Sequence, residues 1–430
     1  MPGRQAVHLR KVAPGARVER LEVFFDLVFV FAFFNIARVV SSDLSVDGLI
    51  RGLLVLALLW WCWCSHMICA NRVRLSEGVA PVVIFVVMAA TLAIALSIPE
   101  AFADAPGGVN GSLIFAGCYL VIRGLHLMLY WLAAHDDPGM RRQLHRFAIP
   151  MLVATALLVA ASLVPRELFG LNHVTIATIL FALAVAVEYG VGPFIGVSGW
   201  TVASAGHWVE RFELIIIIAL GETIISVGVG SDLIGRPVTW PALVAAALGI
   251  SLTATLWWAY FDIIGTAAQQ TMHATHGPQR VRLARDAYIY LHLPMITALI
   301  LLALGAEELL AHLGVRHIDV GAPQPGPGVP LIYSGVALFF LGHLFFQLSI
   351  LGTVAWSRVA TIVLLIALIP LAVHLPALAA MALLAIVCIT LVIVEVLVFS
   401  GARRALREAD RQERTAHEER ETDWRRERYE

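Results

Sequence analysis

The amino-acid sequence predicts an all-α membrane protein with about twelve transmembrane helices in two related six-helix halves. Three observations predict this class: the composition, the length of the apolar segments and a charged motif that occurs twice. Of the 430 residues, 59% are apolar and only 14% are charged, and the mean hydropathy is +0.82. A soluble globular domain has roughly 45–50% apolar and about 25% charged residues, so this composition indicates a chain that lies within a lipid bilayer.

The apolar segments have the length that a helix needs to cross the hydrocarbon core, which is about 20 residues. Polar gaps with glycine and proline separate them, as at residues 106–108 and 321–330. The short gap between the last two segments leaves counts of ten or eleven helices open. In chain order the predicted helices cover residues 22–40, 48–70, 79–98, 111–134, 146–165, 171–193, 207–230, 240–264, 286–308, 330–352, 357–374 and 376–400.

The repeated motif divides the chain into two halves. The sequence VERLE at residues 18–22 aligns with VERFE at residues 209–213, and a tryptophan pair follows each copy in the next predicted helix. We therefore expect six-helix halves at residues 22–193 and 207–400, between a basic N-terminal segment (1–21) and a charged tail (401–430). With an even number of helices in each half, both copies enter the membrane from the same side, as in transporters built from parallel repeats.

The basic residues predict the orientation in the membrane. If the N-terminus is cytoplasmic, the segments on that side hold 23 lysine and arginine residues and those on the other side hold 4. Positive charge concentrates in cytoplasmic loops, so this distribution predicts a multi-pass protein with both termini in the cytoplasm. The formal net charge of −1 gives no indication of nucleic-acid binding.

Both copies of the motif, taken with their flanks, have a known counterpart. The stretches VERLEVFFDLVFVFAFFNIARVV and HWVERFELIIIIALGETIISVG resemble the two signatures of the bacterial low temperature requirement A family. The resemblance covers residues 15–400. It implies a multi-pass protein of the bacterial inner membrane, with a family name that refers to growth in the cold and with no settled biochemical activity.

Acidic and basic side chains inside the predicted helices are the candidate functional residues. An ionisable group at the centre of a bilayer costs roughly 2.5–3.5 kcal/mol, so it needs a partner, a water-filled cavity or a function. Glu22 and Asp26 lie four residues apart, on one face of the first predicted helix. Either both form a proton-binding pair, or Glu22 lies at the headgroups and only Asp26 is buried.

The seventh predicted helix carries Arg211 and Glu222, which share a face but lie about 16 Å apart along the axis. We expect Arg211 to pair with a carboxylate of another helix, most simply Glu22 or Asp26, because a guanidinium keeps its charge when buried. Glu222 either lines a polar interior path, helped by neighbouring glycines such as Gly221, or makes a structural hydrogen bond in its neutral form.

Three further sites are candidates for a solute or ion path. Arg123 and His126 share one stripe of the fourth predicted helix, where Arg123 could equally be a structural counter-charge. His343, near Gln347, occupies the corresponding place in the second half, and Asp262 ends the eighth predicted helix, where anchoring at the interface is the alternative.

The sequence favours transport over catalysis. It contains no metalloprotease, phosphate-binding or nucleophile-elbow motif, and its cysteines and histidines show no convincing metal-ligand spacing, so we expect no metal and no cofactor. The leading hypothesis is a secondary transporter of a small solute or ion, in one version coupled to protons. The alternatives are a cation channel, because Arg20, Phe24 and Asp26 are spaced as in a potassium-channel motif, and a membrane-embedded lipid-processing enzyme. The substrate, the coupling ion and the oligomeric state are not determined.

Overall fold

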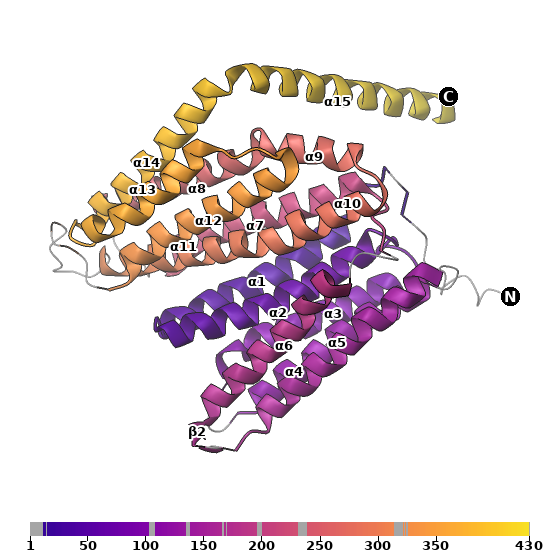
Figure 1. The fold of residues 1–430 in the computed structure, drawn as a ribbon, viewed down its shortest axis with the longest axis horizontal. Helices are drawn as coiled ribbons and strands as arrows, with labels where there is room; N and C mark the ends of the chain where they lie inside the picture. The colour runs from indigo at the N-terminus through magenta and orange to yellow at the C-terminus, as the bar shows by residue number, and fades with distance from the viewer. Residues whose placement is uncertain are drawn as a thin grey trace.

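Each of the twelve predicted segments coincides with a helix of the computed structural model (Figure 1). The structure describes residues 12–13, 15–102, 108–134, 138–165, 167–168, 170–195, 200–230, 239–313, 321, 323 and 326–429. The first half comprises α1 (Arg20–Ser42), α2 (Val46–Ala70), α3 (Ala80–Ser97), the short helix η2 (Ile98–Glu100), α4 (Gly111–Ala133), α5 (Pro138–Ser162), a small hairpin of β1 (Glu167–Leu168) with β2 (Leu171–Asn172), and α6 (His173–Ile195).

The second half contains elements that the sequence did not predict. A polar segment after α8 folds into two short helices, α9 and α10, and the helical chain then continues through a π-helical stretch, η3, directly into α11. The elements are α7 (Ala205–Gly230), α8 (Trp240–Phe261), α9 (Ile264–Ala274), α10 (Gly277–Leu283), η3 (Ala284–Tyr290), α11 (Leu291–Leu313), α12 (Gly328–Leu351), α13 (Trp356–Ala372), α14 (Ala377–Val398) and the tail helix α15 (Ser400–Tyr429).

Ten helical segments of the described chain are long and apolar enough to cross a membrane. The two remaining predicted spans also form helices, but each differs from the others. Helix α7 has 26 residues and carries four acidic or basic side chains, and α13 has only 17 residues. Local apolar length is sufficient to form these helices because a helix in lipid satisfies its own backbone hydrogen bonds.

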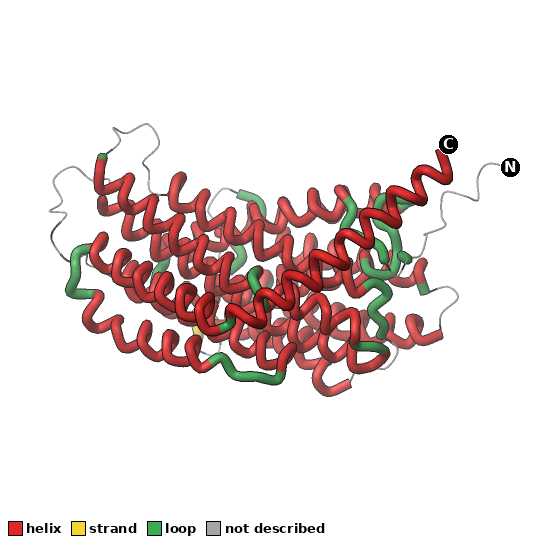
Figure 2. Tube along the Cα trace, turned by 90° about the horizontal axis from the view of Figure 1, so that it is seen from above, coloured by secondary structure: helices red, strands yellow, loops and turns green. Residues whose placement is uncertain are grey.

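Helices α1–α6, which we call the first half, lie beside helices α7–α14, the second half. The helix axes of both are roughly aligned (Figures 1 and 2). Helix α1 packs against α7 and α11, and α2 also reaches α11, so these four helices form the junction between the halves. Aromatic side chains fill the junction. The Phe212 ring lies 5.2 Å from the rings of Trp63 and Tyr288, and the Trp60 indole N–H donates to the Ile289 carbonyl at 2.9 Å.

Glycines set the spacing of the tightest helix pair, α11 with α12. A Cβ atom at Gly335 would lie 2.9 Å from the Ala298 carbonyl oxygen, and one at Gly305 would lie 2.5 Å from the Ile332 side chain. Small residues allow this approach, which supplies the van der Waals packing that holds helices together in lipid. The pair forms one wall of the second half.

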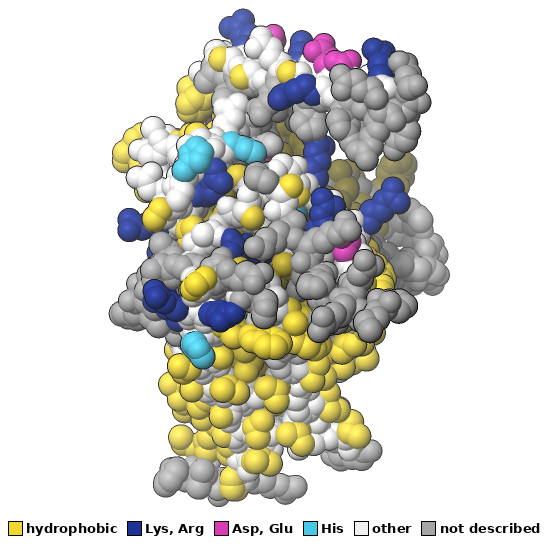
Figure 3. All heavy atoms as spheres, turned by 90° about the vertical axis from the view of Figure 1, so that its right-hand side faces the viewer, with side chains coloured by type: hydrophobic (Ala, Val, Ile, Leu, Met, Phe, Trp, Pro, Cys, Tyr) yellow, Lys and Arg dark blue, Asp and Glu magenta, His cyan; other side chains and the backbone are white. Residues whose placement is uncertain are grey.

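Both termini lie at the same end of the helices (Figure 1). We call this end the termini face. Arginine side chains gather on it, as the view from that side shows (Figure 3). This arrangement agrees with the separation of basic residues that the sequence predicts.

Candidate functional site

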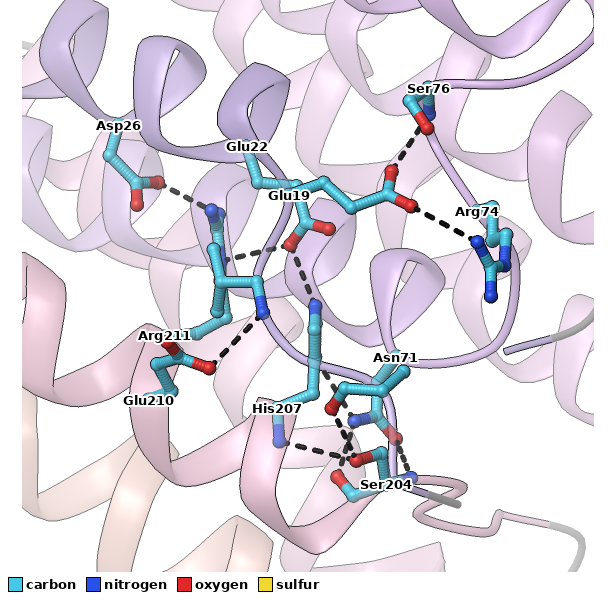
Figure 4. A network of polar contacts seen from close by, with 12 residues as sticks. Glu19, Glu22, Asp26, Asn71, Arg74, Ser76, Ser204, His207, Glu210 and Arg211 are labelled. Atoms are coloured by element: carbon cyan, nitrogen blue, oxygen red, sulfur yellow. Dashed lines mark hydrogen bonds and ion pairs between the residues drawn. The ribbon is translucent and has the colours of Figure 1, made fainter. Parts of the chain in front are cut away.

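Helices α1 and α7 meet through two acidic and two basic side chains that are almost completely buried (Figure 4). The Glu22 carboxylate lies 2.7 Å from Nε2 of His207, and Nη2 of Arg211 donates to Oδ1 of Asp26 at 2.7 Å. Each contact joins residues 185 positions apart in the chain. The residues on each helix are four apart, so two parallel helices bring both pairs together at once.

The expected interhelical partner of Arg211 is confirmed. Its guanidinium contacts Asp26 directly, and its Nε lies 3.6 Å from Oε2 of Glu22. Trp63 of α2 also donates its indole N–H to Oδ1 of Asp26 at 2.7 Å. Glu22 is 2% exposed, so it is buried within the protein as Asp26 is.

Asn71 holds the ring of His207 in position. Its side-chain oxygen accepts from the backbone N–H of Ala203 at 2.8 Å, which fixes the orientation of the amide. The Asn71 NH₂ group therefore faces Ser204 and His207, and donates to the Ser204 carbonyl at 2.7 Å and to Nδ1 of His207 at 3.2 Å. With Nδ1 directed at this NH₂ group, the other ring nitrogen, Nε2, faces the Glu22 carboxylate at 2.7 Å.

The cluster therefore has unequal numbers of formal charges. Glu22 and Asp26 are two acids, and the only permanent cation among the four is Arg211. One oxygen of Asp26, Oδ2, is buried and makes no hydrogen bond within the described structure. The arrangement can take one further proton or cation to reach neutrality. We call Glu22, Asp26, His207 and Arg211 the junction cluster.

The N-terminal segment closes the junction cluster toward the termini face. The backbone N–H of Val18 donates to Glu210 of α7 at 3.1 Å, and Glu19 accepts from the Ser76 backbone at 3.1 Å (Figure 4). Arg74 also lies 4.0 Å from Glu19. The two copies of the motif thus contact one another's helices, although equivalent residues have different surroundings: Arg20 is exposed and Arg211 is buried.

Arg123 and His126 belong to a second buried cluster, within the first half. Arg123 donates to Oε2 of Glu188 on α6 at 3.0 Å, and Tyr119 donates its hydroxyl to the other oxygen. Nδ1 of His126 lies 3.4 Å from the guanidinium. We call this the sealed cluster, because Arg123 and Glu188 are at most 1% exposed and the pair balances its charge.

His343 belongs to a similar cluster in the second half. Arg358 of α13 binds Glu395 of α14 through two parallel contacts of 2.8 and 3.0 Å, and it also contacts Nδ1 of His343. The sequence analysis missed Glu188, Arg358 and Glu395. A signal was present for the two glutamates, each of which is a lone acid in an otherwise apolar predicted helix.

Asp262 follows α8 and binds the start of the tail helix. Its side chain, 6% exposed, contacts Arg403 and accepts from Arg407 at 2.8 Å. It also borders a cavity of about 300 Å³ that includes Gln347, Arg358, Glu395 and Arg403 in its lining. Asp262 thus lies in a charged cavity as well as at a helix end.

Glu222 lies apart from these clusters, further along α7. Its side chain is 6% exposed, as expected for an acid in the interior of the bundle. The glycines around it do not interrupt the helix, since α7 continues unbroken from Ala205 to Gly230. A Cβ atom at Gly221 would meet nothing within 4 Å, so no neighbouring helix of the described chain approaches this glycine closely.

The described residues contain no group of three histidine, cysteine, aspartate or glutamate side chains that could hold a metal ion. Four of the five cysteines are buried and Cys118 is partly buried, and all five are free thiols. The three clusters are built from carboxylates, guanidinium groups and imidazoles.

Comparison with known proteins identifies one family. The model described as "Bacterial low temperature requirement A protein (LtrA)" matches residues 17–393. An uncharacterized protein of Rhizobium meliloti (strain 1021) is 27% identical over 303 residues, which covers 68% of this chain and 69% of the relative. No solved structure matches.

Proposed function

This chain belongs to the bacterial low temperature requirement A family of multi-pass membrane proteins, and on that premise we propose that it is a proton-coupled secondary transporter of a small solute or ion. The junction cluster carries the proposal. Two acids share one guanidinium beside a histidine, with almost no exposure to solvent. Buried ionisable groups of this kind mark proton and ion pathways in membrane proteins.

The position of the cluster supports the same function. It lies where α1 meets α7, the first helices of the two proposed halves. In transporters built from two repeats, binding sites lie at the interface of the repeats, and alternating access moves one repeat against the other. Loading the cluster with a proton would change the electrostatic attraction between α1 and α7, and so couple protonation to that movement.

The twelve-helix, two-half architecture is part of the proposal. Helices α7 and α13 complete the set if both cross the membrane, and the packing order supports two related halves. In the first half α1 packs on α2 and α3; in the second, α7 packs on α8 and α11. In each half a buried arginine binds a glutamate of the last membrane helix and also contacts a histidine. Arg123 binds Glu188 and contacts His126. Arg358 binds Glu395 and contacts His343.

The cation-channel alternative receives less support. In that interpretation Asp26 belongs to the motif that would line an open cation path. Here its side chain is 0% exposed and is held by Arg211 and Trp63. A carboxylate held in this way is unavailable to a stream of hydrated cations.

The test is solute-dependent proton movement in proteoliposomes that contain a pH-sensitive dye. We expect a member of a panel of carboxylates, phosphates, amines and sugars to evoke a pH change with the wild-type protein. Asp26→Asn and Glu222→Gln should insert and fold but abolish it, because neither amide can release a proton. The matched control is Asp286→Asn, since Asp286 is an exposed acid paired with its neighbour Arg285.

Two results would contradict the proposal. One is a voltage-driven potassium current without any solute, which would support the channel alternative. The other is full activity of both Asp26→Asn and Glu222→Gln, which would leave these acids with structural roles.

A further inference from the structure

The cavity beside Asp262 is the open counterpart of the sealed cluster. In the first half, both oxygens of Glu188 are occupied and the arginine–glutamate pair is completely enclosed. In the second half, the equivalent pair of Arg358 and Glu395 borders a space of about 300 Å³. That volume is at the lower end of the range found for small-molecule sites.

Two arginines and two carboxylates line this cavity. Arg358 is neutralised by Glu395 through a bidentate pair. Asp262 is shared between Arg403, which lines the cavity, and Arg407, which does not. The lining therefore holds two guanidinium groups and two carboxylates, and the guanidinium of Arg403 is the one whose carboxylate partner is shared with a residue outside the cavity.

Unpaired polar atoms at the cavity indicate which hydrogen-bonding groups a ligand would supply. Nε of Arg403 and Nε1 of Trp258 are buried donors without a hydrogen-bond partner within the described structure, and Oε1 of Gln347 is a buried acceptor without one. Arg403 and Gln347 are each 7% exposed. Because a buried polar atom left without a hydrogen-bond partner destabilises the structure, a ligand that satisfies these atoms would bind favourably.

Apolar side chains make up much of the remaining wall, together with Gln270, Thr271 and Thr353. Ile264, Leu351 and Phe399 line the cavity, and the Arg403 guanidinium lies 5.8 Å from the centre of the Trp258 ring system. A ligand for this space needs an anionic group for Arg403, a hydrogen-bond donor for Gln347 and an apolar body.

We propose that this cavity binds a small organic anion with an apolar body, and that Arg403 of the tail helix is its charge-recognising residue. Within the proposed transporter this would be the solute site, so this inference rests on the proposed function. A free solute and an anionic lipid headgroup share the required chemistry. The experiment below distinguishes these two sources.

The experiment measures binding of radiolabelled indole-3-acetate to the full-length protein in phosphatidylcholine nanodiscs. Indole and tryptamine carry the same ring without the negative charge, and we expect each to compete at least about tenfold more weakly. Arg403→Gln should lower the affinity for indole-3-acetate about tenfold or more, the loss that one charge-assisted hydrogen bond gives. The matched control is Arg407→Gln, which should stay within about threefold because Arg407 lies outside the cavity and its side chain is 62% exposed.

A second pair of measurements does not depend on Arg403. The 1-methyl derivative of indole-3-acetate lacks the ring N–H, so it should bind the wild type several-fold more weakly than the parent compound. The difference should vanish in Gln347→Leu. Nanodiscs that contain the anionic lipid phosphatidylglycerol distinguish the two sources. Weaker apparent binding of indole-3-acetate in them identifies a lipid headgroup as the occupant, and unchanged binding of indole-3-acetate identifies a free anion.

The proposal is overturned if indole or tryptamine competes as well as indole-3-acetate, or if folded Arg403→Gln and Gln347→Leu proteins bind like the wild type. Binding is measured without any gradient. A positive result alongside absent transport would therefore remove the transporter proposal and leave the anion site in place.

Discussion

At the scale of single residues, the main feature is that each buried charge is satisfied by a residue far away in the chain. Arg211 is 1% exposed and cannot lose its proton, so its burial depends on Asp26 and Glu22. Asn71 has a comparable role for His207, since its amide holds the imidazole in position. These residues fix charge and orientation at the place where α1 meets α7.

The pair of Asp26 and Arg211 should show strong energetic coupling. Arg211→Met should destabilise the protein by roughly 3–5 kcal/mol, because it leaves buried carboxylates without their counter-charge. Adding Asp26→Asn should recover part of that loss, so the double variant should be more stable than the sum of the single effects predicts. Unfolding of the four proteins in detergent micelles measures the coupling free energy.

The control cycle uses Arg285 and Asp286, a neighbouring pair in which the aspartate is 52% exposed. Its coupling should be at most about 1 kcal/mol, since solvent screens exposed pairs. Additive effects at Asp26 and Arg211 would contradict the role that we assign to this contact.

At the scale of helices, the start of α15 is attached to the bundle through a single acid. Arg403 and Arg407 lie one helical turn apart on α15, and both contact Asp262 at the end of α8. Most of the described residues of α15 are exposed. Arg403 differs, since it is 7% exposed and borders the cavity.

Asp262→Asn should release the beginning of the tail helix. The neutral amide cannot hold two guanidinium groups, so this segment should open more often to solvent. Trypsin cleaves after arginine, and we expect cleavage at residues 403–407 to become several-fold faster. The measurement is mass spectrometry of timed digests.

Asp286→Asn is the matched control for the digests, because Asp286 is an acid that does not touch the tail in any described contact. Equal cleavage rates in the wild type and Asp262→Asn would show that packing, not this carboxylate, holds the start of α15.

At the scale of the whole molecule, the basic residues and the termini mark the same end of the helical bundle. Both termini and the arginine-rich surface lie at the termini face (Figures 1 and 3). Positive charge at one end of a helical bundle is the property that orients a membrane protein during insertion. We propose that the termini face is cytoplasmic.

Single-cysteine labelling tests this orientation. Cysteines placed in the tail and at residues 136–140 should be protected from impermeant thiol reagents in intact cells, and one placed at residues 321–328 should react. Cys118→Ser is the suitable background, because Cys118 is only partly buried and the other four cysteines are buried. The reverse labelling pattern would contradict the orientation.

The sequence by itself determined the class of protein, the position of nearly every long helix and the separation of basic charge. These follow from local properties, because a helix in lipid needs only about 20 apolar residues and its own backbone hydrogen bonds. The sequence also gave the partner of Arg211, since a permanent buried charge requires an acid and the repeated motif indicated which helix holds it.

Only the tertiary structure decided the remaining contacts. Glu188 and Glu395 are lone acids in apolar segments, and nothing local shows that each meets an arginine of another helix. The same holds for Asn71, which lies outside the helices and reaches His207 across 136 positions. The cavity at Asp262 depends on how α8, α9, α12, α14 and the tail helix pack. Packing between distant segments is set by side-chain shape over the whole molecule, which no local pattern of residues records.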